Sequence, residues 1–313
     1  MKKPKLMLIG TVEQSEIERW SVGEVVSVYD PYGKTTQADT DARVDSTPNW
    51  DEPVDGVVFV IPNYDKIKTA LLCEALERGK TVGVLKMRAN SYADLKPVRA
   101  LPQEMRDRLF IGEHYQHMPG ATTVKAALQQ KMCGRVGLVD WQFTQPMQGR
   151  SEWMNAYHDL VPEDLSFHHF YVLAQWLEPM DLDVNARSWA PEWLDPRDKG
   201  YFDMHAKGLS GALFNYRVRW GAAQGSGNYF GDVTIEGDKG SLWTNGIQAT
   251  FCPRNGEAAL LKEVAPRYSS WAGVINCFSD MLIGDKEAAR YMMPYDQFDR
   301  VLHMMYAGLP EYA

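Results

Sequence analysis

The chain has 313 residues, of which 45% are apolar, and its formal net charge is −8. This length suits two domains with separate cores, and the acidic balance disfavours a nucleic-acid or anionic-membrane partner. No apolar stretch is long enough to span a bilayer, so we expect a soluble protein.

Residues 5–9 and 24–29 are predicted to form the first two strands, with Gly10 turning the chain after the first and Asp30 ending the second. A strand, a glycine turn, a helix and a later acidic residue make up half of a dinucleotide-binding fold. The glycine fingerprint is incomplete, because Val12 stands where the backbone must approach a pyrophosphate. The turn is therefore either a nucleotide site of unusual posture or purely structural.

The stretch 57–86 is predicted to form a strand, a helix and a second strand. Residues 57–61 are an apolar run typical of a strand buried on both faces, and apolar residues recur at helical spacing over 67–76. Residues 81–85 form the next strand and place Lys86 at its carboxyl end, where ligands of open α/β sheets bind. An ordinary solvated lysine explains Lys86 equally well.

A helix is predicted over 92–101, although Pro97 lies inside it, and a final strand over 109–112. A polar stretch follows that strand. Four side chains in or after it are candidates to line a sugar-sized site: His114, Tyr115, Gln116 and Trp153. Ordinary loop packing explains each of them as well.

The four cysteines are scattered, with no C-x-x-C pair: Cys73, Cys133, Cys252 and Cys277. This distribution is typical of reduced cytosolic thiols, so we expect a cytoplasmic protein without a zinc site or a disulfide framework.

After Gly137 the sequence alternates with period two, which is typical of half-buried strands. Strands are predicted at 138–144, 211–220, 228–236, 241–244 and 249–251, and helices at 166–177, 269–283 and 295–309. This order predicts an α+β domain with one open sheet. We therefore expect domains at 1–117 and 118–313.

One face of that open sheet is expected to lack helices, and five aromatic residues are predicted on it: Trp141, Phe143, Trp220, Tyr229 and Trp243. An apolar face of this kind favours a homodimer or a higher homo-oligomer.

Over nearly its whole length the chain resembles the glucose–fructose oxidoreductase / inositol dehydrogenase family (Gfo/Idh/MocA). The family text D-V-V-I-A-T-P-N … A-L-E-A-G-K-H-V-x-x-E-K-P is matched by 55–63, 75–80 and 84–87. The text G-x-x-x-R-x-x-P … K-x-x-I-x-x-G-x-I-G is matched by 112–119, with Gln116 for the arginine, and by 125–137. The late G-x-x-G-x-L turn is matched by 237–242.

The resemblance implies an N-terminal Rossmann-like parallel-sheet domain and a C-terminal α+β domain with a large, mostly antiparallel open sheet that usually forms a dimer. It also implies an oxidoreductase acting on a sugar, polyol or related hydroxy compound. NAD is the expected cofactor and NADP the less expected one, because Asp30 would repel a 2′-phosphate. The implied cofactor contacts are Gly10, Thr11, Asp30, Pro62, Asn63 and Lys86.

Lys86 corresponds to the family lysine that lies beside the nicotinamide. A family aspartate and histidine, four residues apart on the first helix of the second domain, are matched by Asp164 and His168. The family also has a histidine seven residues before a later tryptophan. Counted back from Trp176, this spacing selects His169, so both histidines stay candidates. A histidine can take the hydroxyl proton as hydride leaves carbon, and a lysine can stabilise the developing alkoxide.

Three departures separate the chain from the family pattern. The glycine turn is lost, Leu85 and Met87 flank the lysine in place of glutamate and proline, and Val172 replaces an acidic residue of the helix. They point either to an unusual cofactor posture or to a relic site that binds no nucleotide.

Two alternatives to the dehydrogenase therefore stay open. One is a lyase, hydrolase or epimerase that retains NAD, and the other is a non-catalytic member that serves as a binding or partner subunit. A metallohydrolase using Glu113, His114 and His117, or the pair His168 and His169, is disfavoured, because His-x-x-His is a weak metal spacing and no third ligand stands out.

Overall fold

The computed structural model describes residues 3–19, 23–61, 67–85, 92–147, 151, 154–155, 157–177, 183–208 and 211–309. The chain folds into two compact units. The first unit comprises Met1–His114 and Tyr268–Asp299, and the second comprises Tyr115–Arg267 and Arg300–Ala313. The chain thus leaves the first unit after His114 and returns to it later, a return that the expected domains 1–117 and 118–313 do not contain.

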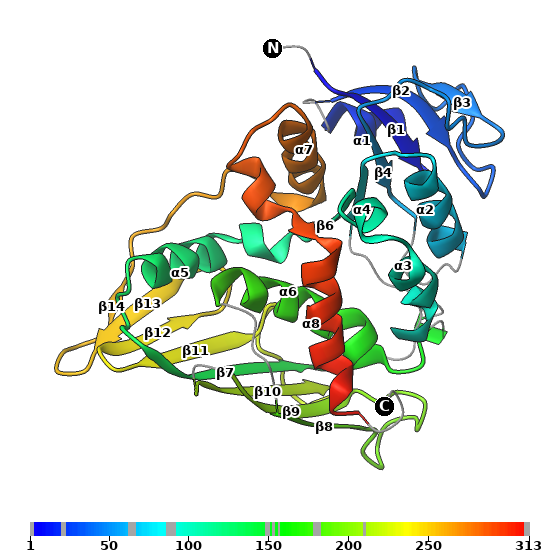
Figure 1. Ribbon diagram of the computed structural model, residues 1–313. Coiled ribbons are helices and arrows are strands. Elements are labelled where there is room, and N and C mark those ends of the chain that lie inside the picture. The colour runs from blue at the N-terminus through cyan, green and yellow to red at the C-terminus, as the bar shows by residue number, and fades with distance from the viewer. Residues whose placement is uncertain are drawn as a thin grey trace. The chain divides into compact units, whose positions relative to one another are not determined.

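The first unit is built on a seven-stranded sheet with the order β15-β6-β5-β4-β1-β2-β3 (Figure 1). Its strands are β1 (Lys5–Ile9), β2 (Glu24–Tyr29), β3 (Arg43–Asp45), β4 (Gly56–Phe59), β5 (Val82–Leu85), β6 (Leu109–Gly112) and β15 (Met293–Pro294). Strands β1 to β6 pair in parallel and β15 pairs antiparallel with β6. The strand order reverses between β4 and β1, so their carboxyl ends form the topological switch point where such sheets bind ligands.

The helices of the first unit are α1 (Gln14–Arg19), α2 (Ile67–Glu77), η1 (Tyr92–Leu95), α3 (Lys96–Ala100), α4 (Gln103–Arg106), α7 (Ser270–Leu282) and η5 (Ala288–Tyr291), with the first residues of α8 (Tyr295–Ala307). The helix predicted over 92–101 is divided into η1 and α3. Pro97 lies in the first turn of α3, where its missing N–H leaves no helical hydrogen bond unmade.

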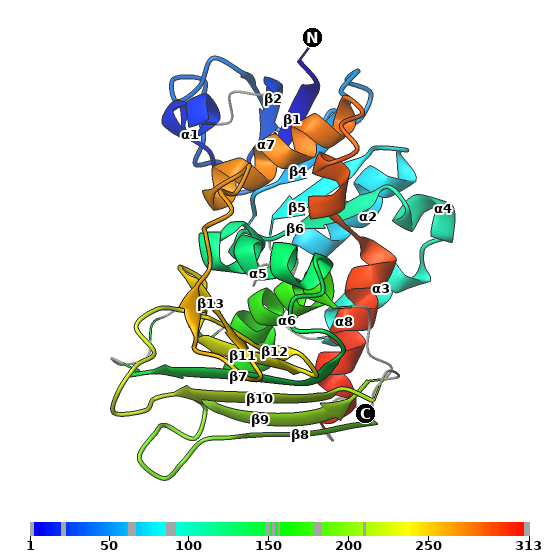
Figure 2. The ribbon, with the colours of Figure 1, turned by 90° about the vertical axis from the view of Figure 1, so that its left-hand side faces the viewer.

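Helix α7 packs closely against the parallel sheet (Figure 2), because three strands each present a glycine to it. A Cβ atom on Gly83 would lie 2.9 Å from the ring of Phe278, and one on Gly56 would lie 2.6 Å from Leu282. Gly112 on β6 faces Val274 of the same helix. This row of glycines explains why a late segment of the chain belongs to the first unit.

The second unit is built on an eight-stranded sheet with the order β14-β13-β12-β11-β7-β10-β9-β8. Its strands are β7 (Val136–Gln145), β8 (Asp183–Trp189), β9 (Tyr201–Lys207), β10 (Leu213–Trp220), β11 (Asp232–Gly237), β12 (Gly240–Thr244), β13 (Ala249–Pro253) and β14 (Ala259–Leu260). Strands β7 and β10 pair in parallel, and the other pairs are antiparallel. The expected fold class, a parallel-sheet domain with a mostly antiparallel second sheet, is confirmed.

The helical segments of the second unit are η2 (Tyr115–His117), α5 (Pro119–Gln129), the π-helical turn η4 (Val161–Leu165), α6 (Ser166–Trp176) and the remainder of α8. Helices α5 and α6 lie over one face of the sheet (Figure 1). The core between α6 and the sheet is aromatic, with Phe170 edge-on to both Phe214 and Tyr216 of β10.

The aromatic residues predicted on the uncovered face of this sheet lie mostly elsewhere. Trp141 and Phe143 are fully buried and Trp220 is 4% exposed, so the placement of these three was wrong. Successive side chains of a strand point to opposite faces, and these residues occupy the inward positions. Tyr229 lies outside the strands and is exposed, whereas Trp243 lies on β12 between buried neighbours and points outward. The expected oligomer therefore stays a prediction.

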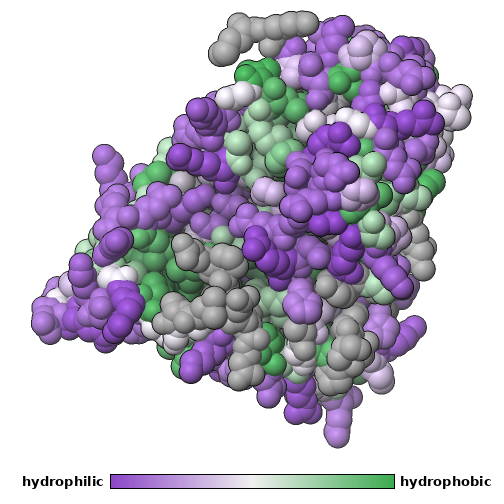
Figure 3. Space-filling view, in the orientation of Figure 1, coloured by the Kyte–Doolittle hydropathy of each residue, from purple (hydrophilic) through white to green (hydrophobic). Residues whose placement is uncertain are grey.

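Hydrophilic residues cover most of the face drawn in Figure 3. All four cysteines are free thiols. Among the residues that the structure describes, no helix is both long and apolar enough to cross a membrane.

Candidate functional site

Gly10 begins the first turn and is required there by packing. Its φ is +138°, and a Cβ atom would lie 2.7 Å from Cγ2 of Val60 and 3.0 Å from the carbonyl carbon of that residue. Its amide donates to the carbonyl oxygen of Tyr29 at 2.8 Å. Gly10 therefore joins the ends of β1, β2 and β4, a role that needs no ligand.

The carboxylate of Asp30, at the end of β2, accepts four hydrogen bonds from residues of the same chain. Its Oδ1 accepts a hydrogen bond from the Tyr32 amide at 2.9 Å. Its Oδ2 accepts three more, from the hydroxyl of Thr11 (2.9 Å) and the amides of Lys34 (3.0 Å) and Thr35 (2.8 Å). Burial alone would raise the pKa of Asp30, but the hydrogen bonds from Tyr32, Thr35 and Thr11 outweigh it and lower the pKa below the usual value.

Val12 replaces the second glycine of the fingerprint, and both its side chain and its amide are used by the fold. The side chain is 2% exposed and packs in the core with Leu8 and Val28. Its amide donates to Oγ1 of Thr35 at 3.0 Å, and that hydroxyl donates in turn to the Val12 carbonyl oxygen at 3.3 Å. The backbone group that would meet a phosphate thus meets a threonine.

The start of helix α1 is hydrogen-bonded to the segment that follows Asp30. The Gln14 amide donates to the carbonyl oxygen of Asp39 at 2.8 Å. Oε1 of Gln14 accepts from the Thr40 hydroxyl (3.3 Å) and from the Asp41 amide (3.1 Å). Residues 32–42, which we call the strap, therefore cover both Asp30 and the first turn of α1.

A dinucleotide in the usual posture of this fold needs two sets of groups. Amides at the start of the first helix hold its diphosphate, and the acidic residue after β2 holds a ribose. Here Val12 and Gln14 supply their amides to the strap, and Asp30 carries four hydrogen bonds from its own chain. The residues of this turn do not fit a dinucleotide in that posture. Four of the expected site residues lie outside the described part of the chain: Pro62, Asn63, Lys86 and Trp153.

A buried carboxylate and an imidazole meet at the carboxyl end of β6. Glu113 is fully buried, and its Oε1 lies 3.1 Å from Nδ1 of His114. The His114 ring packs against Trp271 of α7 with centroids 4.3 Å apart, and its side chain is 27% exposed. A carboxylate beside a partly exposed imidazole is suited to proton transfer.

His169 lies inside the core of the second unit. Its Nε2 is 2.8 Å from the carbonyl oxygen of Tyr229, and its Nδ1 is 2.8 Å from the hydroxyl of Tyr216. Because a carbonyl can only accept, Nε2 carries the proton and Nδ1 accepts from Tyr216. Burial raises the pKa of Tyr216 far above its usual value, which keeps this hydroxyl a donor. The ring also stacks on Trp141 at 4.8 Å and is fully buried.

His168 is 5% exposed, and its ring stacks on Tyr115 with centroids 4.5 Å apart and planes 20° apart. Asp164 lies half-buried in the π-helical turn η4 that leads into α6. From Asp164 to Trp176 the chain is one residue longer than the two family spacings together, so the two spacings select adjacent histidines. Gln116 is buried, with Nε2 3.5 Å from the Tyr171 hydroxyl.

Sequence reasoning missed the strap and gave Glu113 only a minor role. A signal for the strap was present, because residues 31–42 show neither a helical nor a strand period after β2. Glu113 directly follows a predicted strand, a position that favours a site residue in a parallel sheet.

No protein-family model matches the sequence, and no curated protein matches it significantly. Solved structures match over nearly the whole chain. An oxidoreductase from Agrobacterium radiobacter, in complex with NAD⁺, L-tartaric acid and magnesium, is 15% identical with a TM-score of 0.76, covering 98% of this chain and 96% of its own. The WlbA dehydrogenase from Bordetella pertussis, in complex with NADH and UDP-GlcNAcA, is 17% identical with a TM-score of 0.74, covering 100% and 98%.

A putative myo-inositol dehydrogenase from Sinorhizobium meliloti is 14% identical, with a TM-score of 0.70, covering 99% of this chain and 98% of its own. At such identities the likeness concerns the fold. The chain has the two-domain fold of these oxidoreductases, as its resemblance to the glucose–fructose oxidoreductase / inositol dehydrogenase family predicts.

Proposed function

We propose that this chain binds a small, hydroxyl-rich molecule on a dehydrogenase fold and does not seat a dinucleotide at its first turn. The observation that carries the proposal is the saturation of Asp30 by hydrogen bonds from its own chain. A ribose offers two hydroxyl donors to such a carboxylate, so two of the four bonds would be lost on exchange. Each hydrogen bond to a charged group contributes about 1.5–3 kcal/mol, so the exchange weakens binding at least about a hundredfold.

The proposed ligand class rests on two lines of support. The solved structures of similar fold hold L-tartaric acid or UDP-GlcNAcA, and a third is a putative myo-inositol dehydrogenase. These molecules carry several hydroxyl or carboxylate groups. Within this chain, His114 and Tyr115 are polar and partly exposed, and such groups bind hydroxyls well.

Calorimetric titration of the purified protein with NAD⁺, NADH and NADPH tests the proposal, after its absorbance is checked for carried-over nucleotide. We expect no binding in the micromolar range. A thermal-shift screen of sugars, polyols and sugar acids should then find a stabilising ligand without any nucleotide present. Micromolar nucleotide binding, or nucleotide that purifies with the protein, would contradict the proposal.

A nicotinamide-dependent oxidoreductase of sugars or polyols is the second candidate. The contact between Glu113 and His114 favours it, because a carboxylate–imidazole pair at a strand end is suited to acid–base work. In that case NADH binds at micromolar concentration. Glu113→Gln then lowers turnover with little change in nucleotide affinity, which a merely structural Glu113 would not produce.

A further inference from the structure

We infer that the strap is a latch, which opens over the switch point by local unfolding while the sheet beneath it stays folded. The inference rests on the proposed function, since the closed latch is the state that excludes a dinucleotide. The open latch would present Asp30 to a ligand with neighbouring hydroxyl groups, such as a ribose.

The strap is held by hydrogen bonds and contains little buried apolar surface. Only Thr35, Thr40 and Ala42 of its residues are buried, and the other residues from 32 to 41 are exposed. Segments with few buried apolar contacts and exposed hydrogen bonds open at a lower free energy than the core. The strap therefore can open without unfolding β1 or β2.

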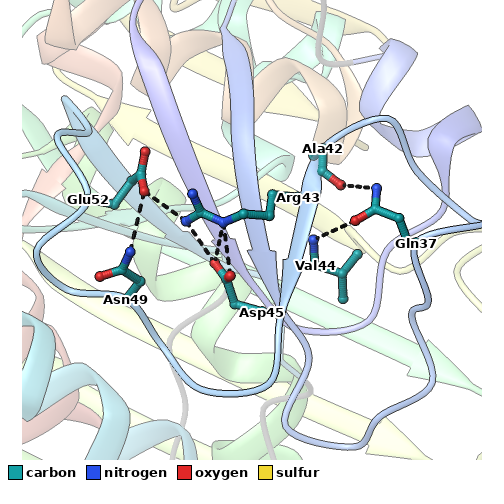
Figure 4. Close-up of polar contacts among 7 residues, drawn as sticks. All are labelled: Gln37, Ala42, Arg43, Val44, Asp45, Asn49 and Glu52. Atoms are coloured by element: carbon teal, nitrogen blue, oxygen red, sulfur yellow. Dashed lines mark hydrogen bonds and ion pairs between the residues drawn. The ribbon is translucent and has the colours of Figure 1, made fainter.

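Gln37 fastens the far end of the strap to the edge of the sheet (Figure 4). Its Nε2 donates to the carbonyl oxygens of Thr40 (3.1 Å) and Ala42 (2.9 Å). Its Oε1 accepts from the amide of Val44 on edge strand β3 at 3.2 Å. The Gln37 side chain thus makes the hydrogen bonds to Ala42 and Val44 that the backbone of a neighbouring strand would make. One exposed side chain therefore joins the strap to the edge of the sheet.

The edge strand itself is pinned independently of the strap (Figure 4). Arg43 contacts Asp45 at 2.9 Å and Glu52 at 2.7 Å, and the Asn49 side chain donates to Glu52 at 3.4 Å. Strand β3 also pairs in parallel with β2. Loss of Gln37 therefore removes the bond between the strap and β3, and we expect it to leave β3 in place.

Within the strap, a local turn places Asp39 over helix α1. The amide and hydroxyl of Thr36 both donate to Oδ2 of Asp39 at 2.7 Å. The Asp39 carbonyl oxygen then accepts from the Gln14 amide. Because Gln37 lies inside this turn and Thr35 directly precedes it, an opening at Gln37 should release the Gln14 and Val12 amides together.

Amide hydrogen exchange, followed by NMR in the full-length protein, tests the latch. We expect the amides of the strap contacts to share one opening free energy, lower than that of Leu8 and Val28 in the sheet: Val12, Gln14, Lys34, Thr35 and Val44. Gln37→Ala removes three hydrogen bonds and should speed exchange of the whole set by about tenfold or more. Asp41→Asn is the matched control, because the contact of Asp41 with Gln14 uses its backbone amide, and it should change exchange by less than about twofold.

Two results would overturn the latch. In one, the strap amides exchange only as slowly as Leu8 and Val28, so the strap is a fixed part of the fold. In the other, Gln37→Ala exposes Val44 alone and leaves Val12 and Gln14 protected, so Gln37 does not hold the strap as a unit.

Titration with ADP-ribose, observed by chemical-shift changes, tests what the latch covers. Apparent affinity scales with the open fraction, so Gln37→Ala should bind ADP-ribose more tightly than the wild type by the factor found in exchange. Equal affinity, or no binding to either protein, would overturn the claim that the latch covers a diol site. Micromolar NADH binding by the wild type would instead refute the proposed function, whatever the exchange data show.

Discussion

Asp30 is the residue on which the first turn depends, because its carboxylate joins Thr11 to the strap amides of Tyr32, Lys34 and Thr35. Asp30→Asn keeps the size of the side chain and removes its charge. Hydrogen bonds to a charged acceptor contribute more than those to a neutral one, so we expect the free energy of unfolding to fall by about 1–3 kcal/mol. Urea denaturation measures this change, and an unaltered midpoint would show that the four bonds contribute little.

Asp30 also gives the stability a defined pH dependence. Its pKa lies below the usual 3.8 in the folded protein, so the unfolded chain takes up a proton first as the pH falls. The contribution of the ionised carboxylate is therefore complete above the unfolded pKa and is lost as the pH falls through the folded pKa. Wild type and Asp30→Asn should differ in urea midpoint near neutral pH and converge on acidification, and a constant difference would exclude this origin.

The two adjacent histidines of α6 are expected to respond differently to mutation. His169→Ala leaves the Tyr216 hydroxyl and the Tyr229 carbonyl without their buried partner and opens a cavity against Trp141. We expect it to lower the free energy of unfolding by about 3 kcal/mol or more. His168→Ala removes the ring that stacks on Tyr115, and we expect a smaller loss than for His169→Ala. Equal losses in urea denaturation would contradict the assignment of His169 to the core.

At the scale of elements, the contact between α7 and the parallel sheet depends on glycines. Gly83→Ala would place a methyl group 2.9 Å from the ring of Phe278, so either the helix or the ring must shift. We expect a loss of about 1–3 kcal/mol in thermal or urea denaturation. Gly137→Ala on β7 is a suitable control, because the nearest atom to its added Cβ would be 4.0 Å away. A loss of similar size in both variants would point to backbone effects instead of the helix contact.

Local patterns were enough to predict β1 and β2 to the residue, because a short apolar run between turn residues carries its own signal. The alternation within β7 and β10 was also visible, yet Trp141 and Trp220 were assigned to the wrong face. Alternation separates the two faces of a sheet, but it does not say which face the helices cover. The irregular stretch after β2 was visible in the sequence, but its contacts with Val12 and Gln14 were not, because they join residues 23 to 27 positions apart that no periodicity connects. Asp30 was located correctly as the end of β2, but its partners were not foreseen.

At the scale of the whole molecule, the predicted oligomer depends on the uncovered face of the large sheet. Arg219 lies against the rings of Trp189 (5.1 Å) and Tyr201 (5.2 Å) and pairs with Asp203 in this sheet. Arginine and large aromatic residues are enriched at protein interfaces. We expect a dimer by sedimentation velocity, with Arg219→Glu shifting it toward monomer and the exposed Lys207→Glu having a smaller effect. A monomeric wild type at all accessible concentrations would refute the predicted dimer.

The return of the chain to the first unit has a consequence for synthesis on the ribosome. Strands β1 to β6 are all made before His114 emerges, but helix α7 follows only after the whole of β7 to β14. Until then Gly56, Gly83 and Gly112 lie on an uncovered face of a sheet that lacks only its edge strand β15. Nascent domains that expose apolar sheet faces are targets for chaperones and for aggregation. We therefore expect the nascent first unit to keep this sheet face exposed until α7 has been made, and to be open to misfolding during that interval.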